Sequence, residues 1–325
     1  MWRCLSQACL ILLAVILSGC KTITLDESFV FQPGQFGDPN EERLTILKYE
    51  NIFAAPTDLT IDVRADGQTA QHHIKSSEFV KTNLTHDFLD NDGEVLAITR
   101  IERAGPSRPL VLHCGGNASD RYETGTLYAQ KMISFADVLM FDYPGYGDSA
   151  GRADADSLRS ANQALANYIN TELSARRPFI LWGHSLGGFV CADMAARLHH
   201  IDGIILEATA TNAKDVSKAV IPWYAKIFIR ARTAPSLDAY DMSETLETST
   251  APILILGAAK DKTLPVELSR KLSQDLTAAG RNVTYVEFPN ANHISIPTQE
   301  NFQTTVEGFI DGLGRMQVSQ AELRP

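Results

Sequence analysis

The chain has 325 residues, of which 44% are hydrophobic and 21% are charged, and its formal net charge is -10. This composition is that of an ordinary globular protein, and the length is sufficient for one large domain with a sizeable core. Because an acidic surface repels phosphate backbones, we expect no nucleic-acid partner.

The first twenty residues, MWRCLSQACLILLAVILSGC, have the features of a signal peptide. Arg3 provides a thin positively charged start, and Leu10 to Leu17 is an unbroken apolar run. Such a run is too short to span a bilayer comfortably as a mature helix, but it fits the apolar region of a signal peptide.

The run ends in Leu17-Ser18-Gly19-Cys20, which resembles the lipobox of bacterial lipoproteins. The resemblance implies that residues 1–19 are removed and that Cys20 becomes a lipidated N-terminus, carrying acyl chains such as palmitate that anchor it to a membrane. A plain secretory signal cleaved near Gly19 is the alternative. Lys21 stands where Asp would favour the inner membrane, so the same resemblance points to the outer membrane of a bacterial cell envelope.

Residues 20–50 then read as the lipidated cysteine followed by a tether, because QPGQFGDPNEER is rich in Gly, Pro and charge. Within the tether, ESFVFQP is apolar enough to dock on a domain surface, and the sequence leaves open whether it does. We expect the folded domain to occupy residues 51–320.

The domain alternates strand-like and helix-like segments. THDFLDNDGEVLAITRIER predicts an antiparallel hairpin, with Asn91-Asp92-Gly93 as its turn. Short, continuous apolar runs spaced by helical patterns predict a parallel sheet covered on both faces, and hence an α/β fold with a mostly parallel, doubly wound sheet. The predicted strands are PLVLHC, DVLMFDY, PFILWG, DGIILEA, PILILGA and VTYVEFP, and the predicted helices cover residues 122–135, 154–174, 187–199, 265–279 and 299–315.

The pentapeptide Gly183-His184-Ser185-Leu186-Gly187 follows a predicted strand and precedes a predicted helix. This G-x-S-x-G pattern in that context predicts a nucleophile elbow, in which the serine hydroxyl is exposed above the carboxyl edge of the sheet. A polar residue that merely starts a helix is the alternative interpretation of Ser185.

A serine hydroxyl needs a base to remove its proton. Among the eight histidines, His293 in PNANHISI follows the last predicted strand, so it should lie on a loop at the same edge as Ser185. Asp261 follows PILILGAAK and gives the chain order Ser, Asp, His, in which the carboxylate would orient His293. Glu207, one strand earlier, is the alternative acid.

Two backbone N–H groups are expected to form the oxyanion hole. One belongs to Leu186, directly after the nucleophile, and the other to the loop His113-Cys114-Gly115-Gly116-Asn117-Ala118. We favour Asn117, with Gly115 or Gly116 as alternatives.

At this point the chain resembles the α/β-hydrolase superfamily over roughly residues 85–315. The matching landmarks are, in order, VLHCGGNA, FDYPGYGDSAG, GHSLGG, GIILEATAT, PILILGAAKD and NANH. They look closest to serine hydrolases whose third strand ends in H-G-N-A. One departure is Gly115, where those relatives carry His.

The resemblance implies that Asp142 and Asp148 in FDYPGYGDSAG brace the floor of the site, and we expect no metal and no cofactor. Residues 208–251 would form a short helical lid, and its middle, AVIPWYAKIFIRAR, is predicted to be a basic amphipathic helix that packs on the domain or enters a lipid surface. Cys114 and Cys191 are expected to be two buried thiols, with a disulfide between them as the alternative.

The implied activity is hydrolysis of carboxylic esters or thioesters through an acyl-enzyme on Ser185. The expected substrate is a small acyl ester or a membrane-proximal lipid, and we expect the protein to be a monomer. A serine peptidase with the same triad and a non-catalytic binding protein of the same fold are the alternatives, because the fold does not name the substrate.

Overall fold

The computed structural model describes residues 21–33, 59–65, 68–74, 82–121, 124–173, 177–219, 221, 225, 229–238 and 240–322. The predicted signal peptide, Cys20 and the second half of the tether lie outside these residues. So do residues 220, 222–224 and 226–228 of the predicted amphipathic helix.

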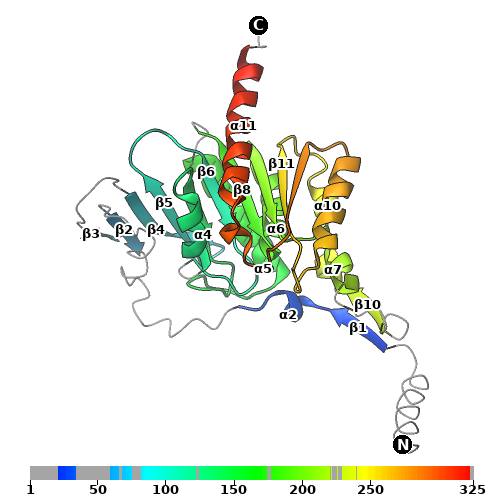
Figure 1. Cartoon of the computed structure of the whole chain (residues 1–325). Helices are drawn as coiled ribbons and strands as arrows, with labels where there is room; N and C mark the ends of the chain where they lie inside the picture. The colour runs from blue at the N-terminus through cyan, green and yellow to red at the C-terminus, as the bar shows by residue number, and fades with distance from the viewer. Residues whose placement is uncertain are drawn as a thin grey trace, which may run out of the picture.

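A ten-stranded sheet forms the centre of the molecule, in the order β12-β11-β9-β8-β6-β7-β5-β4-β2-β3 (Figure 1). Neighbouring strands from β7 to β12 are parallel, whereas β5 is antiparallel to both β7 and β4. The strands are β2 (Leu59–Ala65), β3 (Gln68–Ile74), β4 (Thr82–Asn91), β5 (Glu94–Arg103), β6 (Leu110–Cys114), β7 (Asp137–Phe141), β8 (Phe179–His184), β9 (Gly203–Glu207), β11 (Ile253–Ala258) and β12 (Val283–Phe288).

The predicted mostly parallel, doubly wound α/β sheet is therefore confirmed, and so is the hairpin, which turns at Asp92 and Gly93 with φ of 54° and 87°. The five predicted helices are present as α4 (Thr124–Met132), α5 (Ala155–Glu172), α6 (Leu186–Arg197), α10 (Val266–Ala278) and α11 (Phe302–Glu322). The sequence analysis did not predict β2 and β3, although LTIDVRA alternates apolar and polar residues as a strand does.

The segment between β9 and β11 holds the helices α7 (Ala213–Ala219), α8 (Pro235–Asp238) and α9 (Met242–Thr245), and the strand β10 (Ile229–Thr233). The predicted amphipathic helix is wrong over Ile229–Thr233. There, Arg230 and Arg232 are exposed and alternate with half-buried residues, which is the period of a strand.

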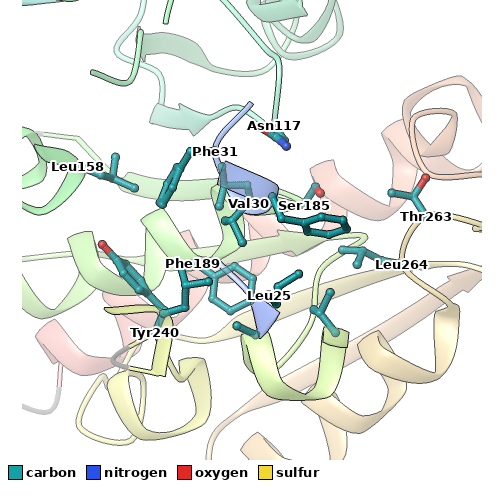
Figure 2. A pocket seen from close by; sticks show the side chains of 15 residues that line it. Leu25, Val30, Phe31, Asn117, Leu158, Ser185, Phe189, Tyr240, Thr263 and Leu264 are labelled. Atoms are coloured by element: carbon teal, nitrogen blue, oxygen red, sulfur yellow. The ribbon is translucent and has the colours of Figure 1, made fainter. Parts of the chain in front are cut away.

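Part of the predicted tether docks on the domain. The strand β1 (Lys21–Leu25) pairs in parallel with β10, and the short helix α2 (Glu27–Val30) follows it. Figure 2 shows Val30 and Phe31 of this segment close to Asn117 and Ser185. The open question about ESFVFQP is thus answered: it covers the carboxyl edge of the parallel strands.

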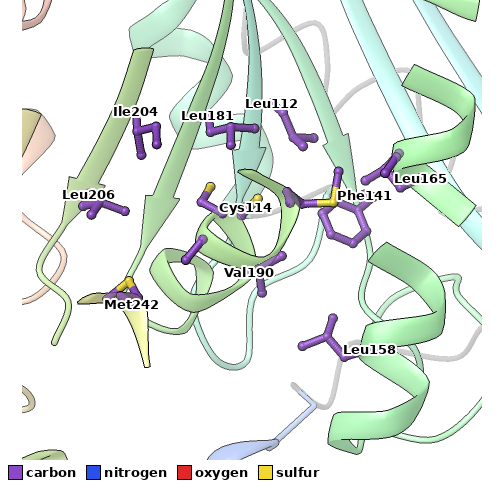
Figure 3. Close-up of a cluster of buried hydrophobic side chains, with 14 of the residues drawn as sticks. Leu112, Cys114, Phe141, Leu158, Leu165, Leu181, Val190, Ile204, Leu206 and Met242 are labelled. Carbon is purple, nitrogen blue, oxygen red and sulfur yellow. The ribbon is translucent and has the colours of Figure 1, made fainter. Parts of the chain in front are cut away.

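The sheet separates two hydrophobic cores. Leu112 and Leu181 face the helices α5 and α6, where they meet Val190 (Figure 3). Val111 and Ile180, one residue earlier on the same strands, face α4 and α11. Because successive side chains of a strand point to opposite faces, continuous apolar runs can supply both cores. Cys114 and Cys191 are buried free thiols in the first core, as predicted.

Candidate active site

Ser185 lies at the turn between β8 and α6. Its backbone has φ 54° and ψ -116°, a region that costs a non-glycine residue about 1–3 kcal/mol. The strain is held by hydrogen bonds on both sides: the Ser185 N–H donates to the Glu207 carbonyl at 2.9 Å, and the Thr209 hydroxyl donates to the Ser185 carbonyl at 2.8 Å. The serine is therefore fixed at the apex of the turn rather than placed there as an ordinary helix cap, because its side chain makes no capping hydrogen bond.

The two glycines of the pentapeptide are required by space. A Cβ at Gly187 would overlap the carbonyl of Cys114 at the end of β6, and a Cβ at Gly183 would overlap the carbonyl of Gly187. The helix α6 consequently starts in backbone contact with the neighbouring strand, and no other residue type fits this turn without moving the backbone.

Three side chains from three loops at this edge form a hydrogen-bonded chain. The Ser185 Oγ lies 3.0 Å from Nε2 of His293, and Nδ1 of His293 lies 2.7 Å from Oδ2 of Asp261. Asp261 is itself fixed, because its Oδ1 accepts the backbone N–H groups of Thr263 and Leu264 at 2.8 and 2.9 Å. The structure thus brings together the serine, histidine and carboxylate that the sequence singled out, in hydrogen-bonding order.

Glu207, the alternative acid, lies elsewhere. Its buried carboxylate accepts hydrogen bonds from the Trp182 indole at 3.0 Å and the Tyr128 hydroxyl at 3.1 Å. Burial raises the pKa of Glu207 to about 7, against the lowering effect of those two hydrogen bonds. Glu207 therefore braces the floor beneath the nucleophile, consistent with its carbonyl bond to the Ser185 N–H.

The sequence analysis missed a contact of His184. Its Nε2 donates to the carbonyl of His293 at 2.8 Å, which ties the loop of the proposed base to the elbow. Burial, together with the nearby His293, lowers the pKa of His184 to about 4, so its ring is neutral at pH 7. His113 stacks on Tyr128 behind this layer, and burial lowers the pKa of His113 to about 3.

The loop after β6 lies against the elbow. A Cβ at Gly116 would come within 3.5 Å of the Ser185 Cβ, and the next residue, Asn117, lines the same cavity as Ser185 and Leu186. The Asn117 side chain holds the loop from the inside, since its Oδ1 accepts the Tyr146 hydroxyl at 2.8 Å and the Ala118 N–H at 3.1 Å.

Gly115, the departure from H-G-N-A, has a structural explanation. The space that a Cβ at position 115 would occupy is filled by the Ser119 hydroxyl, which donates to the Gly116 carbonyl at 2.6 Å. The Ser119 side chain thus stabilises the turn and occupies the space that a side chain at position 115 would need.

Asp142 and Asp148 both bind Arg121, a residue that the sequence analysis did not single out. The buried guanidinium donates to Asp142 at 2.8 Å and to Asp148 at 2.7 Å. The described residues contain no group of three or more His, Cys, Asp or Glu side chains arranged to hold a metal ion. The two carboxylates are therefore bracing groups of the loop after β7.

An apolar cavity of about 170 Å³ opens at Ser185 (Figure 2). Leu186 and Phe189 of α6 line it together with Leu25, Val30 and Phe31 of the N-terminal segment. A nucleophile at the base of an apolar cavity is suited to a substrate with an uncharged, hydrophobic group.

Comparison with known proteins agrees with this architecture. Residues 110–244 match the alpha/beta hydrolase family. Esterase Pf2001 of Pyrococcus furiosus superposes with a TM-score of 0.56 at 15% identity, covering 71% of this chain and 91% of that one. Est1E of Butyrivibrio proteoclasticus, solved with ferulic acid bound, superposes with a TM-score of 0.53 at 16% identity, covering 72% of this chain and 99% of that one.

The chain has the α/β-hydrolase fold. The expected fold is thereby confirmed, and the resemblance to the superfamily is supported over the matched residues. At these identities the solved structures establish the fold alone.

The chain is also similar in sequence to curated proteins. The lysophosphatidylserine lipase ABHD12 of Danio rerio is 28% identical over 203 residues, which are 57% of this chain and 53% of that protein. Protein ABHD12B of Homo sapiens is 29% identical over 222 residues, 62% of this chain and 60% of that protein. The chain thus spans little more than half the length of these relatives, and they support the expectation of a hydrolase.

None of the described helices is long and apolar enough to cross a bilayer.

Proposed function

We propose that this protein hydrolyses carboxylic esters of single acyl chains through a serine acyl-enzyme. One observation carries the proposal: the hydrogen-bonded chain Ser185–His293–Asp261 ends at the base of an apolar cavity. A nucleophile–base pair at 3.0 Å with the base oriented by a buried carboxylate is the arrangement that activates a serine hydroxyl.

In this mechanism the Ser185 Oγ attacks the ester carbonyl carbon while its proton passes to Nε2 of His293. Asp261 keeps Nδ1 protonated and stabilises the imidazolium. The tetrahedral oxyanion is bound by the backbone N–H groups of Leu186 and Asn117. Leu186 is the first residue of α6, so its N–H group has no acceptor within the helix. The positive end of the helix dipole lies at this N-terminus and stabilises a negative charge placed there.

Collapse of this intermediate breaks the bond to the alcohol, which leaves with the proton from His293. Water then enters, gives a proton to His293 and attacks the acyl-serine, and a second collapse releases the carboxylic acid and restores Ser185. A thioester would follow the same course with a thiol as the leaving group.

A monoacyl lipid is the substrate class that we favour. The cavity is apolar beside the nucleophile, so it suits an alkyl chain better than a peptide. The sequence similarity to a lysophosphatidylserine lipase supports the same class. In the same proposal, Cys20 carries the lipid that holds the enzyme at the membrane supplying this substrate, in the outer membrane of a bacterial cell envelope.

The first test is labelling of the purified full chain with a fluorophosphonate probe, combined with hydrolysis of p-nitrophenyl esters. Ser185→Ala and His293→Ala should lose labelling and at least ~10⁴-fold of kcat. Ser107→Ala, at an exposed loop serine, is the matched control and should behave as the wild type. A folded wild type that neither takes up the probe nor cleaves any ester would refute the proposed activity, and cleavage of amides alone would replace it with a peptidase.

The anchor is tested separately by growing cells with a clickable palmitate analogue. The wild type should incorporate the label and fractionate with membranes, whereas Cys20→Ala should do neither. Incorporation that persists in Cys20→Ala would contradict lipidation at this cysteine.

A further inference from the structure

The segment from Lys21 to Pro33 is attached to the domain near both of its ends. At one end, β1 pairs with β10 along five residues, and the Leu25 carbonyl accepts the Ala234 N–H at 2.9 Å. At the other end, the Gln32 N–H donates to the Asn117 side chain at 2.9 Å. The segment therefore bridges the lid on one side and the proposed oxyanion loop on the other.

Between these attachments the segment turns apolar side chains toward the site. Leu25 and Phe31 are each only 6% exposed, and both belong to the core cluster that includes residues of α5 and α6. The turn between them is set by Asp26, whose carboxylate accepts the Phe29 N–H as the N-cap of α2. This cap lets the chain reverse so that residues on both sides of the turn reach one cavity.

These side chains form a wall of the cavity at Ser185. Leu25, Val30 and Phe31 line it together with Leu186 and Phe189 of α6, and Figure 2 shows Leu25, Val30 and Phe31 near Ser185. By contrast, Ile23 on β1 is 53% exposed and does not line the cavity. The segment thus has one face toward the site and another toward solvent.

We propose that Leu25–Phe31 is the acyl-chain specificity element of this enzyme. The inference rests on the proposed function: if Ser185 cleaves acyl esters, the alkyl chain lies in the cavity that this segment closes. A cavity of about 170 Å³ has room for roughly a dozen water-sized groups, which matches a straight acyl chain of medium length. Longer chains must displace Phe31 or Val30, and each methylene that fails to be buried weakens binding about fourfold.

The test compares kcat/KM for p-nitrophenyl acetate, decanoate and palmitate, measured on the full chain. Val30→Trp fills the cavity and should lower the decanoate-to-acetate ratio at least tenfold. Phe31→Ala lengthens it and should raise the palmitate-to-decanoate ratio several-fold. Ile23→Ala, on the outer face of the same segment, is the control and should leave both ratios unchanged.

These ratios of kcat/KM distinguish a change in chain-length specificity from a loss of folded protein. A variant that merely loosens the fold lowers activity on all three esters together, and such a uniform loss in both Val30→Trp and Phe31→Ala would overturn the inference. Chain-length profiles identical to that of the wild type would overturn it as well.

A binding experiment keeps this test independent of the proposed activity. Fluorescence titration of Ser185→Ala with dansyl-undecanoic acid should show saturable binding, which Val30→Trp removes in the same background and Ile23→Ala retains. Equal binding in all three proteins would refute the segment as a cavity wall. Failure of probe labelling at Ser185 with binding intact would refute the hydrolase proposal alone.

Discussion

The cavity at Ser185 is bounded by two regions of different construction. Its floor, formed by the elbow after β8 and the loop after β6, is made of backbone in direct contact, so that even a methyl group at Gly187 would overlap the Cys114 carbonyl. Its cover, formed by Lys21–Pro33 and residues 208–251, touches the cavity with apolar side chains such as Leu25 and Leu237.

Under the proposed function, the difference separates the residues that position the nucleophile from those that select the substrate. Tight backbone contacts position the nucleophile within tenths of an ångström, which an activated serine requires. Apolar side chains on short elements can change size at modest cost. Substitutions in the floor should therefore abolish function or folding, while those in the cover should change selectivity.

The largest effect is expected for Gly187→Ala. The added Cβ would overlap backbone that no side-chain rotation can move, so we expect the free energy of unfolding to fall by about 5 kcal/mol or more. Gly308→Ala on α11 is the control, because a Cβ there meets nothing within 4 Å and Ala is favoured in a helix. Urea unfolding of both variants measures this loss. Near-native stability of Gly187→Ala would mean that the floor is less rigid than its contacts imply.

Asp261→Asn should have the next largest effect. The amide cannot hold the His293 proton on Nδ1, and we expect kcat to fall about 10⁴-fold with little change in stability. Glu207→Gln serves as the comparison and should reduce kcat less than tenfold, because its carboxylate binds Trp182 and Tyr128 instead of the histidine. The reverse ranking in steady-state kinetics would make Glu207 the acid.

Asp142→Asn tests the bracing of the loop after β7. Removing one carboxylate from the buried Arg121 leaves the guanidinium incompletely neutralised, which we expect to cost about 3 kcal/mol of unfolding free energy. Asp156→Asn removes an exposed ion pair with Arg159 and should change stability by less than about 0.5 kcal/mol. Similar unfolding midpoints for the two variants would contradict the bracing role.

Glu207→Gln also has a signature in the pH dependence of stability. The folded-state pKa of about 7 lies above the ordinary value of 4.5, so the stabilising protonated form is fully present below pH 4.5 and is lost as pH rises through 7. Relative to wild type, the variant should therefore gain up to about 3 kcal/mol between pH 4.5 and 8. Urea titrations across this range measure it, with the exposed Glu300→Gln as control. A constant difference between wild type and Glu207→Gln would show that the carboxyl titrates normally.

The smallest effect is expected in the cover. Tyr240→Phe deletes the hydroxyl that donates to the Ala155 carbonyl at 3.0 Å but keeps the ring at the cavity. The loss of one such hydrogen bond should lower stability by about 1 kcal/mol. A drop as large as that for Asp142→Asn, measured by urea unfolding of both variants, would mean that this contact of the cover matters as much for stability as the buried Arg121 ion pairs.

The structure of the floor could be predicted from the sequence much better than that of the cover. The parallel strands, and the proximity of Ser185, His293 and Asp261, could be predicted because each of these residues follows an apolar run, and parallel strands present their carboxyl ends at one edge. Arg121 and the contact of His184 with His293 could not, because they join loops whose distance depends on the whole sheet.

The strands β1 and β10 of the cover were not predicted, for a related reason. Lys21–Leu25 and Ile229–Thr233 pair with each other, and a segment of five residues is too short for its alternating pattern alone to predict a strand. The basic residues near position 230 suggested a helix from their composition, but pairing with a distant strand decided the outcome.

The pairing of β1 with β10 also bears on the order of events during folding. β1 precedes the whole ten-stranded sheet in the chain, whereas its partner follows β9 and most of the parallel strands. Because such a distant pair must wait for the chain between its members, the N-terminal segment docks late, on a sheet that is already largely assembled. Under the proposed function, the protein would thus assemble its nucleophile, base and carboxylate first and acquire its selectivity among acyl chains in one of the last steps of folding.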